Sequence, residues 1–286
     1  CSSSCSWAPP GGMDTGHPIH DVDRVHSLLS HRLAPLANSS TLRAMAPILS
    51  TLGDAAEVLG GRADVATVHC CEHASERLPG HWRWSAADRR LVGTHWAFDL
   101  GAADLTRELS DHLGAPGVLA RFSRLLCDPN RDEGSDTLFR TMAEGAPVEL
   151  NAGLTDADRA VRISDYYRPY HAALDATVGA TLAPILFAVH SFTPLYEGQP
   201  RDMELGVLFD REEALGQALN EHLVNAGYIS IMNEPYTGKG FMYSAETHAQ
   251  RHGRRALEIE VRQDLCVDPA YRARLVRALA AFFARV

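Results

Sequence analysis

The sequence contains no Cys-x-x-Cys pair, only one lysine (Lys239) and no apolar stretch long enough to cross a membrane. Without thiol motifs, we expect the cysteines to be buried free thiols of a cytoplasmic protein. Almost all positive charge is carried by arginine, a residue that suits bidentate recognition of carboxylates. The formal net charge of −9 argues against a nucleic-acid-binding protein that follows phosphates. The cysteines are Cys1, Cys5, Cys70, Cys71, Cys127 and Cys266.

A chain of 286 residues fits one large α/β domain or two small ones. We expect residues 1–20 to be a disordered leader and residues 21–286 to be a single domain. Alternating strands and helices predict a three-layer α/β domain. Strands are predicted at 65–71, 118–122, 185–189, 205–209, 228–232 and 256–261. Helices are predicted at 21–36, 41–52, 85–91, 101–113, 155–182 with an interruption at Pro169, 212–225, 245–252 and 268–286, with a long loop at 132–153.

Two apolar, β-branched runs each end in a histidine. Residues 65–71 are followed by Glu72 and His73, and residues 185–189 by His190. Such runs are typical of strands buried on both faces. Because the loops after the carboxyl ends of strands form the ligand crevice of open α/β sheets, we expect His73 and His190 to meet there. Two histidines with carboxylates nearby indicate a site for zinc or another divalent metal. His69, inside the first run, is expected to be a core residue.

A catalytic metal also needs a third, usually anionic, ligand and an open position. Glu76 follows His73 by three residues, Glu72 is adjacent to it, and Asp99 lies just before a predicted helix. For Asp99 the alternative interpretation is a simple helix cap. The spacing alone leaves these three carboxylates open as candidates.

Arginines and a further carboxylate follow other predicted strands. Arg124 and Arg131 both follow the end of the predicted strand 118–122, a position that suits an anionic substrate or a developing oxyanion, with surface ion pairing as the alternative. Glu260 ends an apolar strand, and Arg262 follows it. Buried carboxylates are uncommon unless they are paired or functional, so Glu260 is a candidate for the base that activates water.

Seven segments occur in one order over residues 65–270, and together they resemble the N-formylglutamate amidohydrolase family. The resemblance implies a mixed central sheet with helices on both faces, as in the zinc carboxypeptidases and aspartoacylases. The segments are Cys71-Glu72-His73-Ala74-Ser75, residues 95–102, Ser123-Arg124-Leu125 with Asp128-x-Asn130-Arg131, Arg168-Pro169-Tyr170-His171, and residues 190–194, 233–236 and 258–264.

The resemblance also implies roles for individual residues. His73 and His190 become metal ligands, Glu260 the general base, and Arg131 the group that polarises the scissile carbonyl. The carboxypeptidase pattern would make Glu76 the third ligand. Relatives often carry a non-acidic residue at that place, whereas the motif around Asp99 persists, so the family favours Asp99. Substrate binding is expected from Arg124, Asn130, His248 and Arg262.

The expected activity is therefore metal-dependent hydrolysis of the amide bond of an N-acyl or N-formyl amino acid, a small acidic molecule. The deformylases of histidine degradation typically carry Pro-His where this chain has Glu72-His73, so the chain looks like a sister branch whose substrate the motifs do not fix. Two alternatives are a carboxypeptidase-like peptidase and a non-catalytic binding protein that retains the pocket. We expect neither nucleic acid nor a membrane as a partner.

Overall fold

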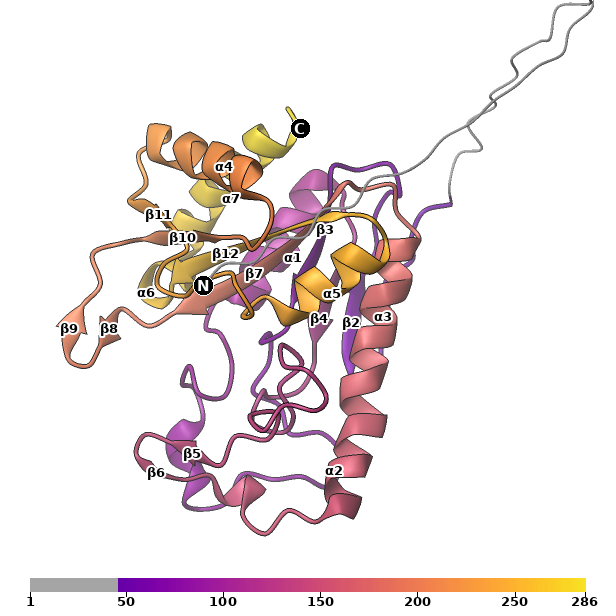
Figure 1. Ribbon diagram of the computed structural model, residues 1–286, viewed down its shortest axis with the longest axis vertical. Helices are drawn as coiled ribbons and strands as arrows, with labels where there is room; N and C mark the ends of the chain where they lie inside the picture. The colour runs from indigo at the N-terminus through magenta and orange to yellow at the C-terminus, as the bar shows by residue number, and fades with distance from the viewer. Residues whose placement is uncertain (1–45) are drawn as a thin grey trace, which may run out of the picture. The chain divides into compact units, whose positions relative to one another are not determined.

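An eight-stranded sheet runs through the described part of the chain, residues 46–286 of this computed structural model (Figure 1). Its strands are β1 (Thr51–Leu52), β2 (Ala56–Leu59), β3 (Thr67–Cys71), β4 (Gly117–Ala120), β7 (Ile185–Phe192), β10 (Leu205–Leu208), β11 (Ser230–Met232) and β12 (Arg255–Arg262), in the order β1-β2-β4-β3-β7-β12-β10-β11. Two small hairpins stand apart: β5 (Met142–Ala143) with β6 (Ala146–Pro147), and β8 (Leu195–Tyr196) with β9 (Gln199–Pro200).

The helices are α1 (Ala102–Leu113), α2 (Asp156–Arg162), α3 (Arg168–Gly179), α4 (Glu213–Asn225), α5 (Tyr243–Arg251), α6 (Gln263–Cys266) and α7 (Pro269–Phe283). Two 3₁₀ turns, η1 (Asp88–Leu91) and η2 (Glu149–Asn151), and a π-helical segment, η3 (Ile163–Tyr167), complete the list. None of the helices in residues 46–286 is both long and apolar enough to cross a bilayer.

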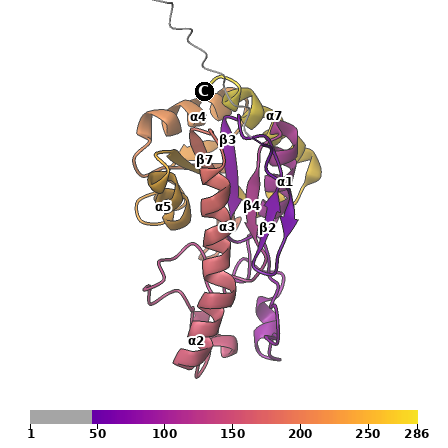
Figure 2. The same ribbon diagram turned by 90° about the vertical axis from the view of Figure 1, so that its right-hand side faces the viewer.

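Side chains of successive strand residues alternate between two cores, which explains why the central runs are apolar throughout. In β7, Ile185, Phe187 and Val189 pack with α1, α4 and α7. Leu186 and Ala188 pack in the opposite core with α3 and α5. Figures 1 and 2 show α3 and α5 on one face of the sheet and α1 and α7 on the other.

The sheet is mixed. Strands β4, β3, β7 and β12 are parallel, whereas β2 and β10 run antiparallel to their neighbours β4 and β12. The predicted fold class, a three-layer α/β domain with a mixed central sheet, is confirmed. Because the four parallel strands end at the same edge, residues that follow them gather there.

Two helix predictions are wrong in detail. The helix predicted at 41–52 is replaced over its described part by an extended segment that ends in β1, where the Ile48 amide donates to the Gly61 carbonyl at 2.8 Å. Pro47 explains this, because proline disrupts a helix interior. The helix at 155–182 is not interrupted at Pro169, which lies in the first turn of α3. The irregularity is instead the π turn η3 just before it.

Strand β7 is longer than predicted, since it continues through Phe192. His190 and Ser191 therefore lie within the strand and not in a turn after it.

The cysteine prediction is confirmed for the described part of the chain: Cys70, Cys71, Cys127 and Cys266 are buried and free. The predicted leader 1–20, the predicted helix 21–36, Cys1 and Cys5 lie outside the described residues.

Candidate metal centre

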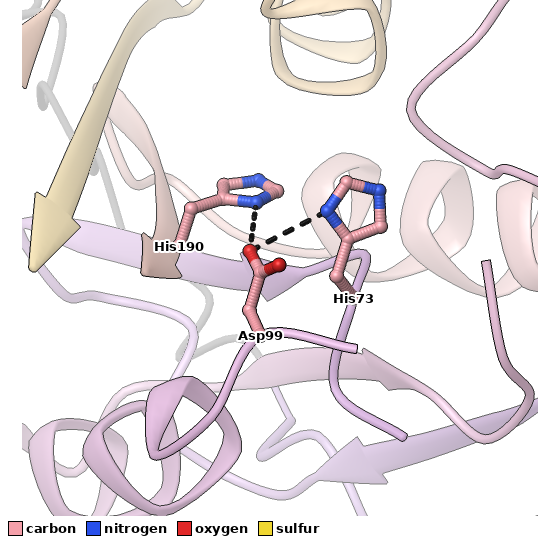
Figure 3. Close-up of side chains that lie close together, drawn as sticks. All are labelled: His73, Asp99 and His190. Carbon is pink, nitrogen blue, oxygen red and sulfur yellow. Dashed lines mark hydrogen bonds and ion pairs between the residues drawn. The ribbon is translucent and has the colours of Figure 1, made fainter. Parts of the chain in front are cut away.

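Two imidazole rings meet over one carboxylate at the carboxyl end of the parallel strands (Figure 3). Nδ1 of His190 lies 2.9 Å from Oδ2 of Asp99, and Nδ1 of His73 lies 3.4 Å from the same oxygen. The ring centroids are 4.9 Å apart. All three residues are buried, and one ligand atom from each lies within 4.8 Å of the others, which fits a single cation.

The backbone explains why these residues converge. Strands β3 and β7 are parallel neighbours, so His73 and His190 arrive at the same edge. The loop that carries Asp99 is tied to the first of them, because the Asp99 amide donates to the His73 carbonyl at 2.8 Å. Oδ2 of Asp99 also accepts from the Ser191 amide at 3.2 Å. Asp99 is not the cap of α1, whose N-cap residue is Gly101.

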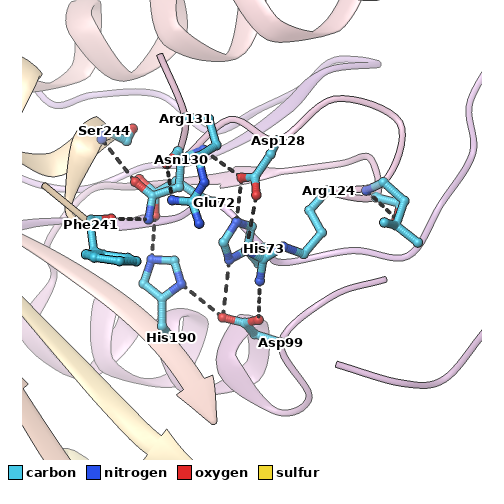
Figure 4. Close-up of polar contacts among 12 residues, drawn as sticks. Glu72, His73, Asp99, Arg124, Asp128, Asn130, Arg131, His190, Phe241 and Ser244 are labelled. Atoms are coloured by element: carbon cyan, nitrogen blue, oxygen red, sulfur yellow. Dashed lines mark hydrogen bonds and ion pairs between the residues drawn. The ribbon is translucent and has the colours of Figure 1, made fainter. Parts of the chain in front are cut away.

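Each imidazole also contacts a carboxylate through its other ring nitrogen, Nε2 (Figure 4). Nε2 of His73 lies 2.8 Å from Asp128, and Nε2 of His190 lies 3.1 Å from Glu72. This leaves both Nδ1 atoms directed at Asp99, and Nδ1 of His73 forms no hydrogen bond at all. Histidines that ligate metals almost always donate their other ring N–H to a carboxylate or carbonyl. The side chains therefore fit a divalent cation between His73, Asp99 and His190.

The centre gathers buried carboxylates around its imidazole rings. Burial opposes ionisation of Glu72 and Asp99, but the neighbouring histidines outweigh it, lowering the pKa of Glu72 to about 2 and that of Asp99 below its usual range. Burial likewise opposes the charge on His190, yet Glu258, Asp99 and Glu72 raise its pKa well above the usual value. A bound divalent ion would supply the positive charge that these carboxylates otherwise draw from protonated imidazole.

The other two candidates for the third ligand lie elsewhere. Oε2 of Glu76 accepts a hydrogen bond from the Gly93 amide at 2.5 Å, outside the metal-sized group. Glu72 contacts His190 on the Nε2 side, away from Asp99, and its other oxygen accepts from the Tyr170 hydroxyl at 3.2 Å. The geometry favours Asp99 as the anionic ligand and Glu72 as a residue that orients His190.

These positions predict a graded response in metal binding. Glu72→Gln is expected to weaken zinc affinity by about 10–100-fold, the usual effect of losing a group that orients a ligand. The matched Glu76→Gln variant should bind zinc like the unchanged protein. Competition with a chromophoric chelator measures both affinities. A loss of zinc from Glu76→Gln larger than that from Glu72→Gln would return the ligand role to the His-x-x-Glu spacing.

The centre opens into a cavity of about 630 Å³, within the range of small-molecule sites. Glu258 and Glu260 lie on one face of β12 and line the cavity, and Glu260 is the register partner of His190. Both are buried, and Oε2 of each has no hydrogen-bond partner. Burial raises the pKa of Glu258 to about 7 and that of Glu260 well above its usual value, with attraction to His190 opposing the shift. Glu260 thus has a free oxygen that can take a proton.

Three arginines line the same cavity but differ in their partners. Arg124 pairs with Asp128 at 3.1 Å and with Asp99 at 3.5 Å, so carboxylates of the centre already share its charge. Within residues 46–286, neither Arg131 nor Arg140 forms an ion pair; their guanidinium groups lie 5.9 Å from the Phe241 ring and 5.3 Å from the Trp96 ring. Guanidinium groups without an acidic partner in a cavity are suited to an anionic ligand.

Asn130 also lines the cavity, but its side chain is used by the protein itself. Its Nδ2 donates to the Phe241 carbonyl at 3.1 Å, and its Oδ1 accepts from the Ser244 amide at 3.1 Å. These bonds fasten the Asn130–Arg131 loop to the start of α5. Asn130 therefore positions Arg131 in the structure, and contact of Asn130 with a substrate stays a prediction.

Two predicted substrate-binding residues do not reach the cavity. His248 is buried between α5 and α3, where it contacts His171 at 2.9 Å and Asp175 at 3.2 Å. Arg262 pairs with Asp264 at 2.8 Å and donates to the Arg201 carbonyl at 3.0 Å. Both side chains are committed to contacts within the protein, and contact of either one with a substrate stays a prediction.

His69 is a core residue, as predicted. Its ring lies 2.9 Å from the Thr67 hydroxyl and 2.7 Å from that of Ser110, and burial lowers its pKa to about 3.

The sequence interpretation missed Arg140, Trp96 and the orienting role of Asp128. The sequence offered only one signal for Arg140, its place in the long loop at 132–153. This side of the cavity is built from residues far apart in sequence, which local patterns do not connect.

Comparison with known proteins agrees with this geometry. Residues 65–267 match the family described as N-formylglutamate amidohydrolase. The gene product Atu2144 from Agrobacterium tumefaciens is similar in structure, with a TM-score of 0.73, 29% identity, and coverage of 82% of this chain and 94% of that chain. An N-formylglutamate amidohydrolase from Ralstonia eutropha JMP134 shares the fold, with a TM-score of 0.56, 23% identity, and coverage of 82% and 97%. The search of curated proteins returned no match. The chain belongs to the N-formylglutamate amidohydrolase family.

Proposed function

We propose that this protein is a metal-dependent amidohydrolase that cleaves the amide bond of an N-acyl or N-formyl amino acid and releases the free amino acid. One observation carries the proposal: two histidines, each backed by a carboxylate, direct Nδ1 at Asp99 beside the unpartnered oxygen of Glu260 in one cavity. Family membership and the relative from Ralstonia eutropha, named an N-formylglutamate amidohydrolase, support amide hydrolysis as the reaction type.

In this proposal His73, Asp99 and His190 hold the cation, with zinc as the expected metal. When bound, the cation supplies a Lewis acid that acidifies water and polarises a carbonyl. Glu260 takes the proton from the attacking water and passes it to the departing amine. Arg131 donates to the carbonyl oxygen as negative charge develops on it. Arg124 keeps Asp99 and Asp128 in place, so its contribution is to the ligand geometry.

The carboxylate of the amino acid is assigned to Arg140. This guanidinium lines the cavity, stacks near Trp96 and has no acidic partner among residues 46–286. Arg140→Gln is therefore expected to raise KM for N-formyl-L-glutamate by at least about tenfold with little change in kcat, since a hydrogen bond to a charged group contributes roughly 1.5–3 kcal/mol.

The control for Arg140 is a change in the substrate. The diamide of N-formylglutamate has no carboxylate, so its KM should be the same for Arg140→Gln and for the unchanged protein. Steady-state kinetics on the two compounds separate the effects. A rise in KM that is equal for the acid and for its diamide would contradict the assignment.

A panel of substrates tests the proposal as a whole. Zinc-loaded protein is incubated with N-acyl amino acids and with short peptides that have a free carboxyl terminus, and the release of amine is measured. We expect release from the N-acyl amino acids. Cleavage of peptides alone would favour a carboxypeptidase-like activity, and zinc binding without any turnover would favour a binding protein.

A further inference from the structure

Part of the cavity wall is apolar and aromatic. Phe192, Leu195, Tyr196 and Tyr236 line it, and we refer to these four side chains as the aromatic wall. Phe192 is the last residue of β7, Leu195 and Tyr196 form β8, and Tyr236 follows β11. The arginines of the cavity come from segments after β4, and β3, which leads to His73, lies between β4 and β7 in the sheet. A ligand that reaches both groups of side chains therefore passes the metal centre.

Three of the four side chains of the aromatic wall are open to solvent, whereas Phe192 is buried. Leu195 is 56% exposed, Tyr196 58% and Tyr236 40%. Single exposed apolar residues are common on proteins, but several gathered on one concave surface mark a binding site. Here they gather at the cavity that holds the candidate metal ligands, so covering them with a ligand removes apolar area from water.

The aromatic wall is also held in a fixed arrangement. The guanidinium of Arg201 lies 5.4 Å from the Phe192 ring, 5.0 Å from the Tyr196 ring and 5.8 Å from the Tyr236 ring. Arg201 donates in addition to the Thr193 carbonyl at 3.1 Å. Contacts of a cation with aromatic rings are favourable. Arg201, which is not among the residues lining the cavity, therefore keeps three of the four side chains together before a ligand arrives.

Charge and size define what fits against this surface. Glu197, next to Tyr196 in sequence, lines the cavity, whereas Arg201 does not, so an anionic group at this end of a ligand would face a carboxylate without a lining arginine to offset it. A formyl group is too small to cover the three exposed side chains of the wall in a cavity of about 630 Å³. A neutral apolar chain or ring has both the size and the polarity required.

We propose that the acyl group of the substrate is larger than formyl and apolar, and that it packs on the aromatic wall while the carboxylate of the amino acid faces the arginines. This inference rests on the proposed function and adds the acyl specificity to it. The aromatic wall is then the part of the cavity that selects among N-acyl amino acids.

The test compares N-formyl-L-glutamate with N-hexanoyl-L-glutamate, which differ only in the acyl group. Binding is measured by calorimetry on zinc-loaded Glu260→Gln, so that the ligand is not consumed, and kcat/KM is measured on the zinc-loaded unchanged protein. Each methylene that is fully buried strengthens binding by about fourfold. We expect the hexanoyl compound to bind at least about tenfold more tightly and to have a kcat/KM higher by a similar factor.

Variants locate the effect. Tyr196→Ala with Tyr236→Ala, two exposed positions, should remove most of the advantage of the hexanoyl compound, so that the affinities for the two compounds become similar. Val224→Ala on α4, 48% exposed and outside the cavity, is the matched control and should change neither.

Equal or tighter binding of the formyl compound would overturn the inference while leaving amide hydrolysis standing, and so would equal losses for both compounds in the double variant. If neither compound is hydrolysed but the hexanoyl compound binds more tightly and depends on the two tyrosines, the ligand preference is supported and the proposed hydrolase function is overturned.

Discussion

Glu260→Gln is expected to retain zinc and substrate affinity and to lose turnover by about 10²–10⁴-fold, the usual contribution of a general base. Glutamine preserves the shape of the side chain and removes its ability to take a proton. The structural reason is the position of Glu260: it is 5% exposed, faces the cavity from β12 opposite His190, and has a carboxylate oxygen without a hydrogen-bond partner. The loss should appear in kcat and not in KM.

Glu258→Gln is the matched control, because Glu258 lies on the same face of the same strand. Its register partner in β7 is Ala188, which lies two residues before His190 and is therefore further from the carboxyl ends of the parallel strands. Its oxygen lies 3.7 Å from Nε2 of His190, on the side of the ring that does not face Asp99. The Glu258 variant should therefore be much milder in kcat. Near-normal turnover in Glu260→Gln would move the base to Glu258 or Glu72.

Removing a ligand should have the second large effect. His73→Ala, His190→Ala and Asp99→Asn are each expected to abolish stoichiometric zinc binding, because a catalytic zinc site has only three protein ligands. For Asp99→Asn the loss should exceed the about 10–100-fold caused by changing a residue behind a ligand. Elemental analysis of the purified variants gives the metal content.

The fold should survive these substitutions. The three side chains are clustered at one end of the sheet, whereas the two large cores lie along its faces. Circular dichroism and thermal unfolding of the metal-free variants should match those of the metal-free unchanged protein. A variant that is folded and carries full zinc would remove that residue from the ligand set.

Local pattern was enough to predict the central strands and the convergence of two histidines. The run that becomes β7 is apolar on both faces because a core covers each face, and such a run is visible in sequence. The edge strand β1 and its neighbour β2 were not predicted, since they are short and partly exposed. Strand β2 depends on pairing with β4 across a long separation in sequence, which local propensity does not encode, and β1 pairs in turn with β2.

Contacts between distant segments account for the rest of what was missed. Asp128 reaches His73 across 55 residues, and Glu72 reaches His190 across 118. A resemblance to a family brought His248 into consideration but does not specify which side of α5 its ring faces. Arg262 has the strand alternation of Glu260, yet it stands at the end of β12 and turns to backbone carbonyls of the neighbouring segment.

The most direct test of the account is the metal dependence of amide hydrolysis on a single preparation of the full chain. Release of amine from N-formyl- and N-hexanoyl-L-glutamate is measured before chelation, after removal of metal, and after titration with zinc, in parallel with Asp99→Asn. The account predicts that hydrolysis disappears with the metal, returns fully at one zinc per chain, and does not return in Asp99→Asn. Hydrolysis that persists in metal-free protein, or that zinc restores equally in Asp99→Asn, would contradict it.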